Sequence, residues 1–255
     1  MIITEKYGQL EYLTAEGISA PHCFTTRFGG VSTGIFDSMN IAIKEGEQEE
    51  NVRQNIAILS GAIGFDPQNL ICTRQTHSDI VRVVTKQDHL DIFHRDYPEC
   101  DALVTNDPGT ALMIYTADCT PLLLHDPVTG AVGAAHAGWK GTVLDIGGKT
   151  VQAMIDHFGC DPKNIRAAIG PNMATLRFEL GAERVDAFVD GALDPLGDLV
   201  GDATAQPARK FVCRRFRFRL LRRRFVATVA GPVEDWEPDV FPNRRAVREI
   251  GRAHV

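Results

Sequence analysis

The sequence predicts an α+β fold that forms a single domain over residues 1–255. Apolar runs of strand length and of helical period are interspersed along the chain, without the strict alternation of a doubly wound sheet. The 255 residues are 44% hydrophobic and 24% charged, which is sufficient for one sizeable core. No fixed-period repeat and no low-complexity linker precedes about residue 190. These observations favour one domain over two.

The first part of the chain predicts a strand, a glycine turn and a helix. Residues 21–26 read as a strand that leads into Gly29-Gly30, where two glycines permit a tight turn. A plain turn and a functional loop are both consistent with these two glycines. Residues 47–64 carry charged positions followed by apolar ones at helical spacing and end at Gly64, which predicts an amphipathic helix.

The middle of the chain is rich in strands. β-prone runs at 69–73 and 80–85 flank His77 and place it at a turn or at a strand end. Four further strands are predicted at 102–105, 111–116, 121–125 and 131–136.

The last two of these strands form a predicted hairpin. Residues 126–130 have the Asp, Pro and Gly content of a tight connection between them. Residues 141–158 read as one helix that ends at Gly159, and a strand is predicted at 165–169.

Composition excludes several classes of protein. No apolar run approaches the roughly 18 residues that span a bilayer, and the first residues lack the order of a signal peptide, so we expect a cytoplasmic protein that does not bind membranes. The six cysteines show no paired spacing, which predicts reduced thiols. Residues 1–208 carry a net charge of −14, which makes nucleic acid an unfavourable partner.

Residues 209–224 form an anomalous arginine-rich segment. Nine of its sixteen residues are Lys or Arg, interleaved with aromatic and aliphatic residues, and residues 209–255 carry a net charge of +8. Arginine falls on every face of any regular element built from this segment, so it lacks amphipathicity. We favour a solvated segment over a nucleic-acid-binding element.

Three residues carry the strongest chemical signal: His77, Cys119 and His136. Two imidazoles and one thiolate form a ligand set that suits zinc. Three protein ligands leave a fourth position open, which is typical of a catalytic zinc site. The 17-residue step from Cys119 to His136 holds a strand, a turn and a returning strand, so these two side chains can meet in space. The trio therefore predicts an enzyme.

The same residues permit other interpretations. Cys119 with His136 or His77 would also suit a cysteine hydrolase, in which an imidazole activates a thiolate nucleophile. A metal-binding or partner-binding protein without catalysis, and an enzyme that edits peptidoglycan precursors, also remain open.

Six motifs give the sequence a resemblance to a known family. They lie at residues 26–32, 39–42, 74–77, 100–105, 116–121 and 135–141. In this order they resemble the YfiH-type family, also named laccase-domain or multicopper polyphenol oxidase and now interpreted as purine nucleoside phosphorylases. The resemblance covers roughly residues 20–181.

The resemblance implies a fold, a metal and an activity. The implied fold is a four-layer α/β/β/α sandwich with mixed sheets. His77, Cys119 and His136 become the catalytic zinc ligands. The implied reaction is cleavage of adenosine, inosine and S-methyl-5′-thioadenosine by inorganic phosphate, with adenosine deamination as a second activity. The implied partners are therefore a nucleoside and phosphate, and the oligomeric state stays open.

Literal laccase chemistry does not fit this chain. The type-1 and trinuclear copper centres of a multicopper oxidase together need about ten histidines. The blue-copper (type-1) centre alone takes two of them with a cysteine. The chain has eight histidines, most of them outside the motifs. Zinc is therefore the expected metal, and copper is the less favoured alternative.

Phosphorolysis also requires residues that bind an anion, a ribose and a base. The candidates for phosphate are Arg27, Lys140, Arg244 and Arg245. The candidates for ribose or base are Asn40, Gln75, Thr116 and Asp118. Asp101 either acts in the site or caps a strand, and Asp101 or Asp118 would move the proton in deamination.

The sequence departs from the family pattern in its last part. Residues 170–181 lack a cysteine that family members often carry, so a substrate contact at the edge of the site would differ. Beyond Ala205 only residues 241–245 stay recognisable, and the arginine-rich segment stands where a helix is implied. This departure suggests a local reading-frame error, which re-sequencing of the coding DNA would test.

Overall fold

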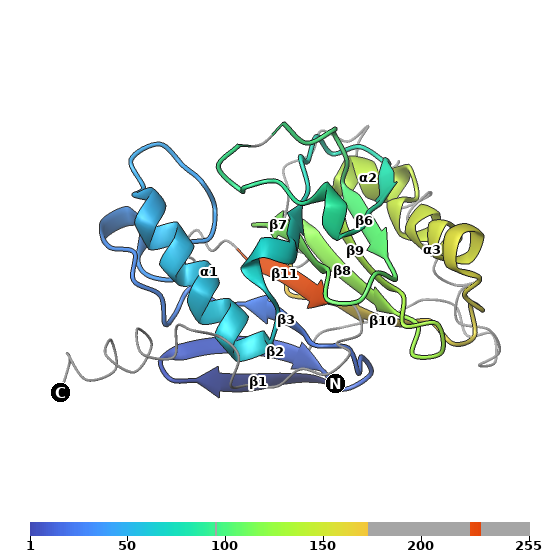
Figure 1. Cartoon of the computed structure of the whole chain (residues 1–255), viewed down its shortest axis with the longest axis horizontal. Helices are drawn as coiled ribbons and strands as arrows, with labels where there is room; N and C mark the ends of the chain where they lie inside the picture. The colour runs from blue at the N-terminus through green and yellow to red at the C-terminus, as the bar shows by residue number, and fades with distance from the viewer. Residues whose placement is uncertain (95, 173–224, 231–255) are drawn as a thin grey trace, which may run out of the picture.

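The computed structural model describes residues 1–94, 96–172 and 225–230, which form two mixed β-sheets with helices (Figure 1). The first sheet has six strands in the order β1-β2-β3-β11-β7-β4. Their bounds are Ile2–Tyr7 (β1), Leu10–Ala15 (β2), His22–Thr25 (β3), Phe225–Ala230 (β11), Ala111–Thr116 (β7) and Leu70–Cys72 (β4).

The second sheet has five strands in the order β10-β8-β9-β6-β5. Their bounds are Arg166–Ile169 (β10), Thr120–His125 (β8), Val132–Ala137 (β9), Ala102–Thr105 (β6) and Val81–Val83 (β5). The α-helices are Glu49–Ile63 (α1), Trp139–Val143 (α2) and Ile146–Phe158 (α3), and the short 3-10 helices are Gly34–Phe36 (η1), Pro67–Asn69 (η2) and Lys86–Asp88 (η3).

Strand β11 occupies an inner position in the first sheet. It pairs antiparallel with β3 on one side and with β7 on the other. Strand β4 then pairs parallel with β7 at the sheet edge. The hairpin of β1 and β2 therefore joins the rest of this sheet through β3 and β11.

The predicted hairpin of β8 and β9 is confirmed and fixes the geometry of the site. The two strands are antiparallel, with Thr120 opposite Ala137 and Pro121 opposite His136. One step further along this register, Cys119 comes opposite Gly138. The hairpin thus brings the thiol beside the residues that follow β9.

Two clusters of buried apolar side chains surround the sheets. The larger cluster joins residues of the first sheet and of α1 with inner residues of the second sheet, such as Leu103, Leu123 and Ala134. The smaller cluster packs Ile146, Met154 and other α3 residues on the second sheet. Strands β7 and β11 each contact β8 and β9, so the sheets lie face to face.

The predicted helix over 141–158 is wrong in one respect, because two helices occupy this range. Helix α2 ends at Val143 and α3 begins at Ile146. Asp145 lies between them in the left-handed conformation with φ of 60°, and its carboxylate caps α3 by accepting from the Gly148 N–H. The helix at 49–63 is confirmed, and it ends at left-handed Gly64 as expected.

No described helix is long and apolar enough to cross a membrane. The arginine-rich segment 209–224, the segment 173–181, and both Arg244 and Arg245 lie outside the described residues.

Candidate metal centre

The structure brings His77, Cys119 and His136 together, as the sequence predicts. His77 lies in the loop between β4 and β5, Cys119 directly precedes β8, and His136 lies near the end of β9. Each residue offers one ligand atom, and the three atoms all lie within 4.8 Å of one another. Among the residues the structure describes, this is the one group of three or more such side chains that could hold a metal ion.

The spacing of these atoms suits a tetrahedral metal ion. The Cys119 Sγ and His77 Nε2 atoms are 3.7 Å apart. Ligand bonds of about 2.0–2.3 Å in a tetrahedron separate neighbouring ligand atoms by about 3.3–3.8 Å. The His77 and His136 rings meet edge to face, with centroids 4.9 Å apart and an interplanar angle of 78°. The donors need only small shifts to close on one ion.

Asp101 organises the inner side of this centre. Its fully buried carboxylate lies 2.7 Å from His136 Nδ1 and accepts hydrogen bonds from the Ser78 hydroxyl and from the backbone N–H groups of Thr76, His77 and Ser78. Burial raises the pKa of this carboxyl, but the His136, Ser78 and Thr76 hydrogen bonds lower it more, so the pKa lies well below its usual range. Asp101 is therefore an anion whose partners are in place.

The His77 loop adopts an unusual backbone conformation around this carboxylate. His77 has a φ of 59°, which is uncommon for a residue with a Cβ and costs roughly 1–2 kcal/mol. Successive N–H groups at residues 76–78 converge on Asp101 and form an anion-binding nest. These hydrogen bonds offset the cost and aim the imidazole toward Cys119.

Gly138 leaves the space that the ligands need. A Cβ at this position would lie 2.6 Å from His77 Cδ2 and 3.2 Å from Cys119 Sγ. The Gly138 backbone is extended, with φ of −71°, so its conformation does not require glycine. The close approach of two ligand side chains is what excludes a larger residue.

The environment of Cys119 keeps its thiol protonated at neutral pH. Burial, followed by the negative charges of Asp118 and Asp101, raises the pKa of the thiol to about 11. A cysteine that works as a free nucleophile needs positive charge nearby instead. A divalent cation bound to Sγ, Nε2 of His77 and the ring of His136 would supply that charge and deprotonate the thiol.

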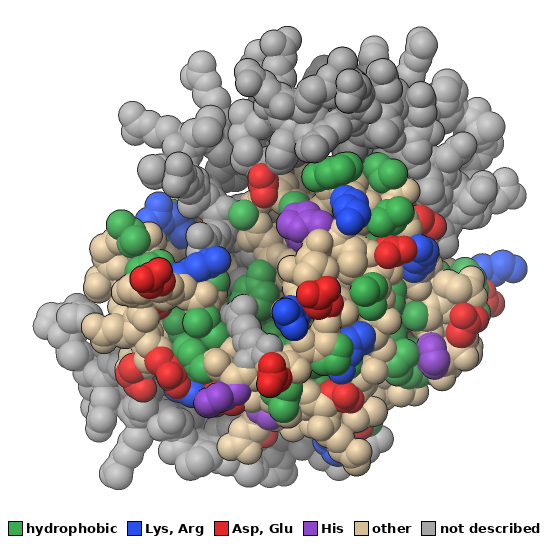
Figure 2. Space-filling model, turned by 90° about the horizontal axis from the view of Figure 1, so that it is seen from above, with side chains coloured by type: hydrophobic (Ala, Val, Ile, Leu, Met, Phe, Trp, Pro, Cys, Tyr) green, Lys and Arg blue, Asp and Glu red, His purple; other side chains and the backbone are tan. Residues whose placement is uncertain are grey.

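The centre is open on one side in the described part of the chain. His136 is buried, Cys119 is partly buried and His77 is exposed. Figure 2 shows one face of the molecule, on which histidine side chains reach the surface among acidic, basic and hydrophobic ones. Exposure therefore rises from His136 through Cys119 to His77, so the side of the candidate centre at His77 faces solvent.

Three of the predicted substrate residues are engaged with their own surroundings. Arg27 donates to the backbone carbonyl of Asp37 and pairs with its carboxylate. Asn40 bonds to Ala42 and Glu47 and so shapes its own loop. Gln75 exchanges hydrogen bonds with both backbone groups of Tyr115, at 2.7 and 2.8 Å. These contacts give all three residues a structural role.

The other predicted substrate residues differ in exposure. Thr116 is buried at the end of β7, whereas Asp118 and Lys140 are exposed; Asp118 directly precedes Cys119 in the chain, and Lys140 directly follows Trp139. Ser78 and Gly138 are not among the predicted site residues, although both flank predicted ligands in the sequence. Their signals were present, since Ser78 follows His77 directly and Gly138 lies two residues after His136.

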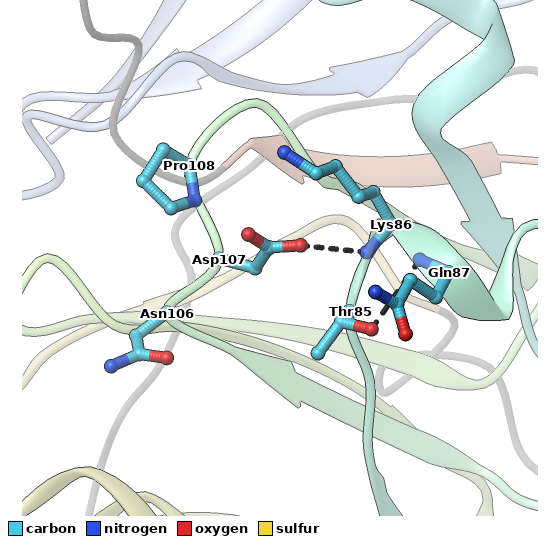
Figure 3. A pocket seen from close by; sticks show the side chains of 6 residues that line it. All are labelled: Thr85, Lys86, Gln87, Asn106, Asp107 and Pro108. Carbon is cyan, nitrogen blue, oxygen red and sulfur yellow. Dashed lines mark hydrogen bonds between the residues drawn. The ribbon is translucent and has the colours of Figure 1, made fainter.

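A surface pocket of about 340 Å³ lies away from the centre (Figure 3). It is lined by Thr85, Lys86, Gln87, Asn106, Asp107 and Pro108. These residues follow the carboxyl ends of the parallel strands β5 and β6, whereas His77 and Asp101 precede the amino ends. The Asp107 carboxylate accepts the Lys86 N–H at 2.7 Å and ties the two loops together. The pocket therefore does not belong to the metal centre.

The fold and the centre together define a mixed α/β protein with a candidate His–Cys–His metal site. The chain belongs to the family described as multi-copper polyphenol oxidoreductase laccase, which matches residues 21–208. The resemblance to the YfiH-type proteins is thereby confirmed.

Similar proteins carry a different functional name. A purine nucleoside phosphorylase of Deinococcus radiodurans is 42% identical over 179 residues, which are 70% of this chain and 67% of that protein. The purine nucleoside phosphorylase YlmD of Bacillus subtilis is 31% identical over 237 residues, which are 90% and 84% of the two chains. The crystal structure of Bacillus licheniformis hypothetical protein YfiH superposes with a TM-score of 0.67 at 29% identity, covering 76% and 74%.

Proposed function

We propose that this chain is a zinc-dependent purine nucleoside phosphorylase that cleaves adenosine, inosine and S-methyl-5′-thioadenosine with phosphate. The observation that carries the proposal is the convergence of His77, Cys119 and His136 within 4.8 Å around the partnered Asp101. Relatives named purine nucleoside phosphorylase support the reaction class.

The residues present fit a zinc ion. Two imidazoles and one thiolate are the preferred donors, and the space beside Gly138 would be filled by a Cβ. The proposed ion supplies Lewis acidity, which polarises an oxygen of a bound reactant. Copper is a less favoured occupant, because the described residues offer one His–Cys–His group and no larger cluster of histidines.

Phosphorolysis exchanges one bond for another at the sugar. A phosphate oxygen attacks the anomeric carbon of the ribose, the bond to the purine nitrogen breaks, and the purine leaves with a proton. Lys140 is exposed next to the centre and would hold the phosphate dianion. Arg27 is the second candidate, although it is already paired with Asp37, and Arg244 and Arg245 complete the proposed set.

Asp118 is the better candidate for a proton carrier. It is exposed beside Cys119, whereas the Asp101 carboxylate is buried and accepts five hydrogen bonds. The same argument applies to adenosine deamination, which we propose as a side activity. Asn40, Gln75 and Thr116 stay proposed contacts of the ribose or base, and Asn40 and Gln75 also order their own loops.

Replacement of Cys119 tests the proposal. Wild-type protein should contain zinc and release ribose 1-phosphate from adenosine with phosphate, whereas Cys119→Ala should lose both. Cys160→Ala is the matched control, because Cys160 is a buried thiol packed with α3 residues in the smaller apolar cluster. Undiminished phosphorolysis by Cys119→Ala would refute the proposed role of the ion.

A cysteine hydrolase is the second candidate, favoured by the 3.7 Å approach of Cys119 Sγ to His77 Nε2. It predicts that iodoacetamide alkylates Cys119 in zinc-loaded protein and that an acyl-enzyme can be trapped. The phosphorylase predicts protection by zinc. An editing enzyme for peptidoglycan precursors would show turnover of those precursors and none of nucleosides.

We propose a single domain over residues 1–255, built as a four-layer α/β/β/α sandwich, that works in the cytoplasm without a membrane or nucleic-acid partner. Limited proteolysis tests the first part, because one domain predicts a single protected core.

A further inference from the structure

The Asp101 carboxylate divides its hydrogen bonds between its two oxygens. Oδ1 lies 3.1 Å from the His77 backbone N and 2.7 Å from His136 Nδ1. Oδ2 accepts from the Thr76 N–H at 3.1 Å and from both the N–H and the hydroxyl of Ser78 at 2.7 Å. One buried side chain thus connects two segments that each supply a metal ligand.

We propose that Asp101 and Ser78 are positioning residues that assemble the metal ligands before the ion binds. This inference rests on the metal-binding part of the proposed function. Asp101 touches neither ion nor substrate. It acts through His77 and His136, and Ser78 holds Asp101 in place.

The first effect of Asp101 is on the His136 ring. A carboxylate accepts and does not donate, so it requires the proton on Nδ1 and leaves the lone pair of Nε2 free for a metal ion. Such an outer partner fixes the orientation of the ring. The 2.7 Å contact is buried, which excludes water as a competitor for Nδ1.

The second effect is on the His77 backbone. The positive φ of His77 is held by three converging N–H groups, and the carboxylate is the acceptor for all three. Without it, these donors point at a buried site with no anion. The loop would then relax toward an ordinary φ at His77, and the imidazole of His77 would point away from Cys119.

Asp101→Asn keeps the size of the side chain and changes only its hydrogen-bonding groups, so it tests these two effects without leaving a cavity. An amide has one acceptor oxygen and one donor NH2 group, whereas both oxygens of Asp101 face N–H donors. If the amide NH2 takes the place of Oδ1, it donates to His136 Nδ1. His136 must then carry its proton on Nε2, and Nε2 can no longer bind a metal ion. If the amide NH2 takes the place of Oδ2, it faces the N–H groups of Thr76 and Ser78. Donor then faces donor, and both hydrogen bonds are lost.

Ser78 gives a milder and independent test. Ser78→Ala removes one of the five hydrogen bonds to the carboxylate and retains the backbone contact. Ser78→Thr keeps the hydroxyl and should restore the wild-type state. Asp126→Asn is the matched control, because Asp126 is equally buried but follows β8 at its far end from Cys119.

The experiment measures zinc affinity and ligand geometry in the full chain. Zinc dissociation constants come from competition with a chelating dye, and Co²⁺ substitution reports tetrahedral thiolate ligation by absorption. We expect zinc binding to weaken about 10- to 100-fold in Asp101→Asn and about 3- to 10-fold in Ser78→Ala. Ser78→Thr and Asp126→Asn should match the wild type in both readouts.

Wild-type zinc affinity and an unchanged Co²⁺ spectrum in Asp101→Asn would overturn the proposal. If Asp101→Asn does not fold, the variants Ser78→Ala and Ser78→Thr provide the test. Equal zinc affinity of Ser78→Ala and the wild type would then overturn the proposal. Phosphorolysis is measured separately. Tight zinc binding without ribose 1-phosphate release would refute the phosphorylase and leave the positioning role standing.

Discussion

Gly138→Ala should damage the metal centre without straining the backbone. The added Cβ would lie 2.6 Å from His77 Cδ2, whereas carbon atoms in contact prefer about 3.5 Å or more. The His77 ring or the Gly138 backbone must therefore move by about 0.9 Å, and Cys119 Sγ, 3.2 Å from the new atom, limits the escape. Overpacking of this kind costs about 1–3 kcal/mol of folding stability.

The loss in activity should exceed the loss in stability. A displacement of about 1 Å at a catalytic group costs on the order of a hundredfold in rate. For the proposed phosphorolysis of adenosine, we therefore expect kcat/KM to fall by about two orders of magnitude, with weaker binding of the proposed zinc ion and a modest fall in Tm. Steady-state assays with excess zinc, dye competition and thermal unfolding measure the three quantities.

Gly147→Ala is the matched control for this prediction. Its Cβ would meet only Leu122 Cδ2, at 3.4 Å, and it lies in the first turn of α3. Alanine in a helix should raise stability by about 0.5–1 kcal/mol and leave zinc binding unchanged. If Gly138→Ala binds zinc and catalyses phosphorolysis as well as the wild type does, the candidate centre does not depend on the space beside Gly138.

Substitutions at three further residues test the scaffold. Burial lowers the pKa of His22, whose ring accepts the Ala15 N–H at 2.8 Å. Because the unfolded chain binds this proton more readily, stability should be full above about pH 6.5 and fall as pH drops below it, and His22→Gln should flatten that part of a Tm-versus-pH profile. Gly29→Ala should cost more than about 3 kcal/mol in urea unfolding, since φ is 91° and the Cβ would lie 2.2 Å from Leu10 Cα; a smaller loss would mean the loop shifts freely. Asn55→Ala should cost about 2–4 kcal/mol by the same measurement, because this fully buried amide makes hydrogen bonds to two segments of the loop before α1, at Val31-Ser32 and at Asn40, and Asn55→Asp should recover little.

The sequence predicted the elements whose signals are local. The period and terminal glycine of Glu49–Ile63 defined α1, and the Asp-Pro and Gly residues of 126–130 defined the hairpin of β8 and β9. The break at Asp145 was missed because apolar spacing continues across it. The sequence signal for this break is Asp145 itself, because an aspartate is a preferred N-cap residue and its carboxylate accepts the Gly148 N–H at the start of α3.

The candidate site was predicted in part for the same reason. Three short motifs located His77, Cys119 and His136, and the hairpin register explained why two of them meet. The role of Asp101 could not be read from the sequence, because it depends on hydrogen bonds across 23–35 positions of the chain. Substrate contacts of Arg27, Asn40 and Gln75 stay predictions, since their observed partners are local or structural.

The inner position of β11 has a consequence for biosynthesis. β3 and β7 leave the ribosome long before Phe225–Ala230 are made, yet each needs that strand as a neighbour. Until then each presents an unpaired edge, which is a template for pairing with other chains. Closing a sheet across some 200 residues is also slow. These edges stay open to other chains while the remaining segment is translated, so we expect less protein to accumulate when chaperones are scarce.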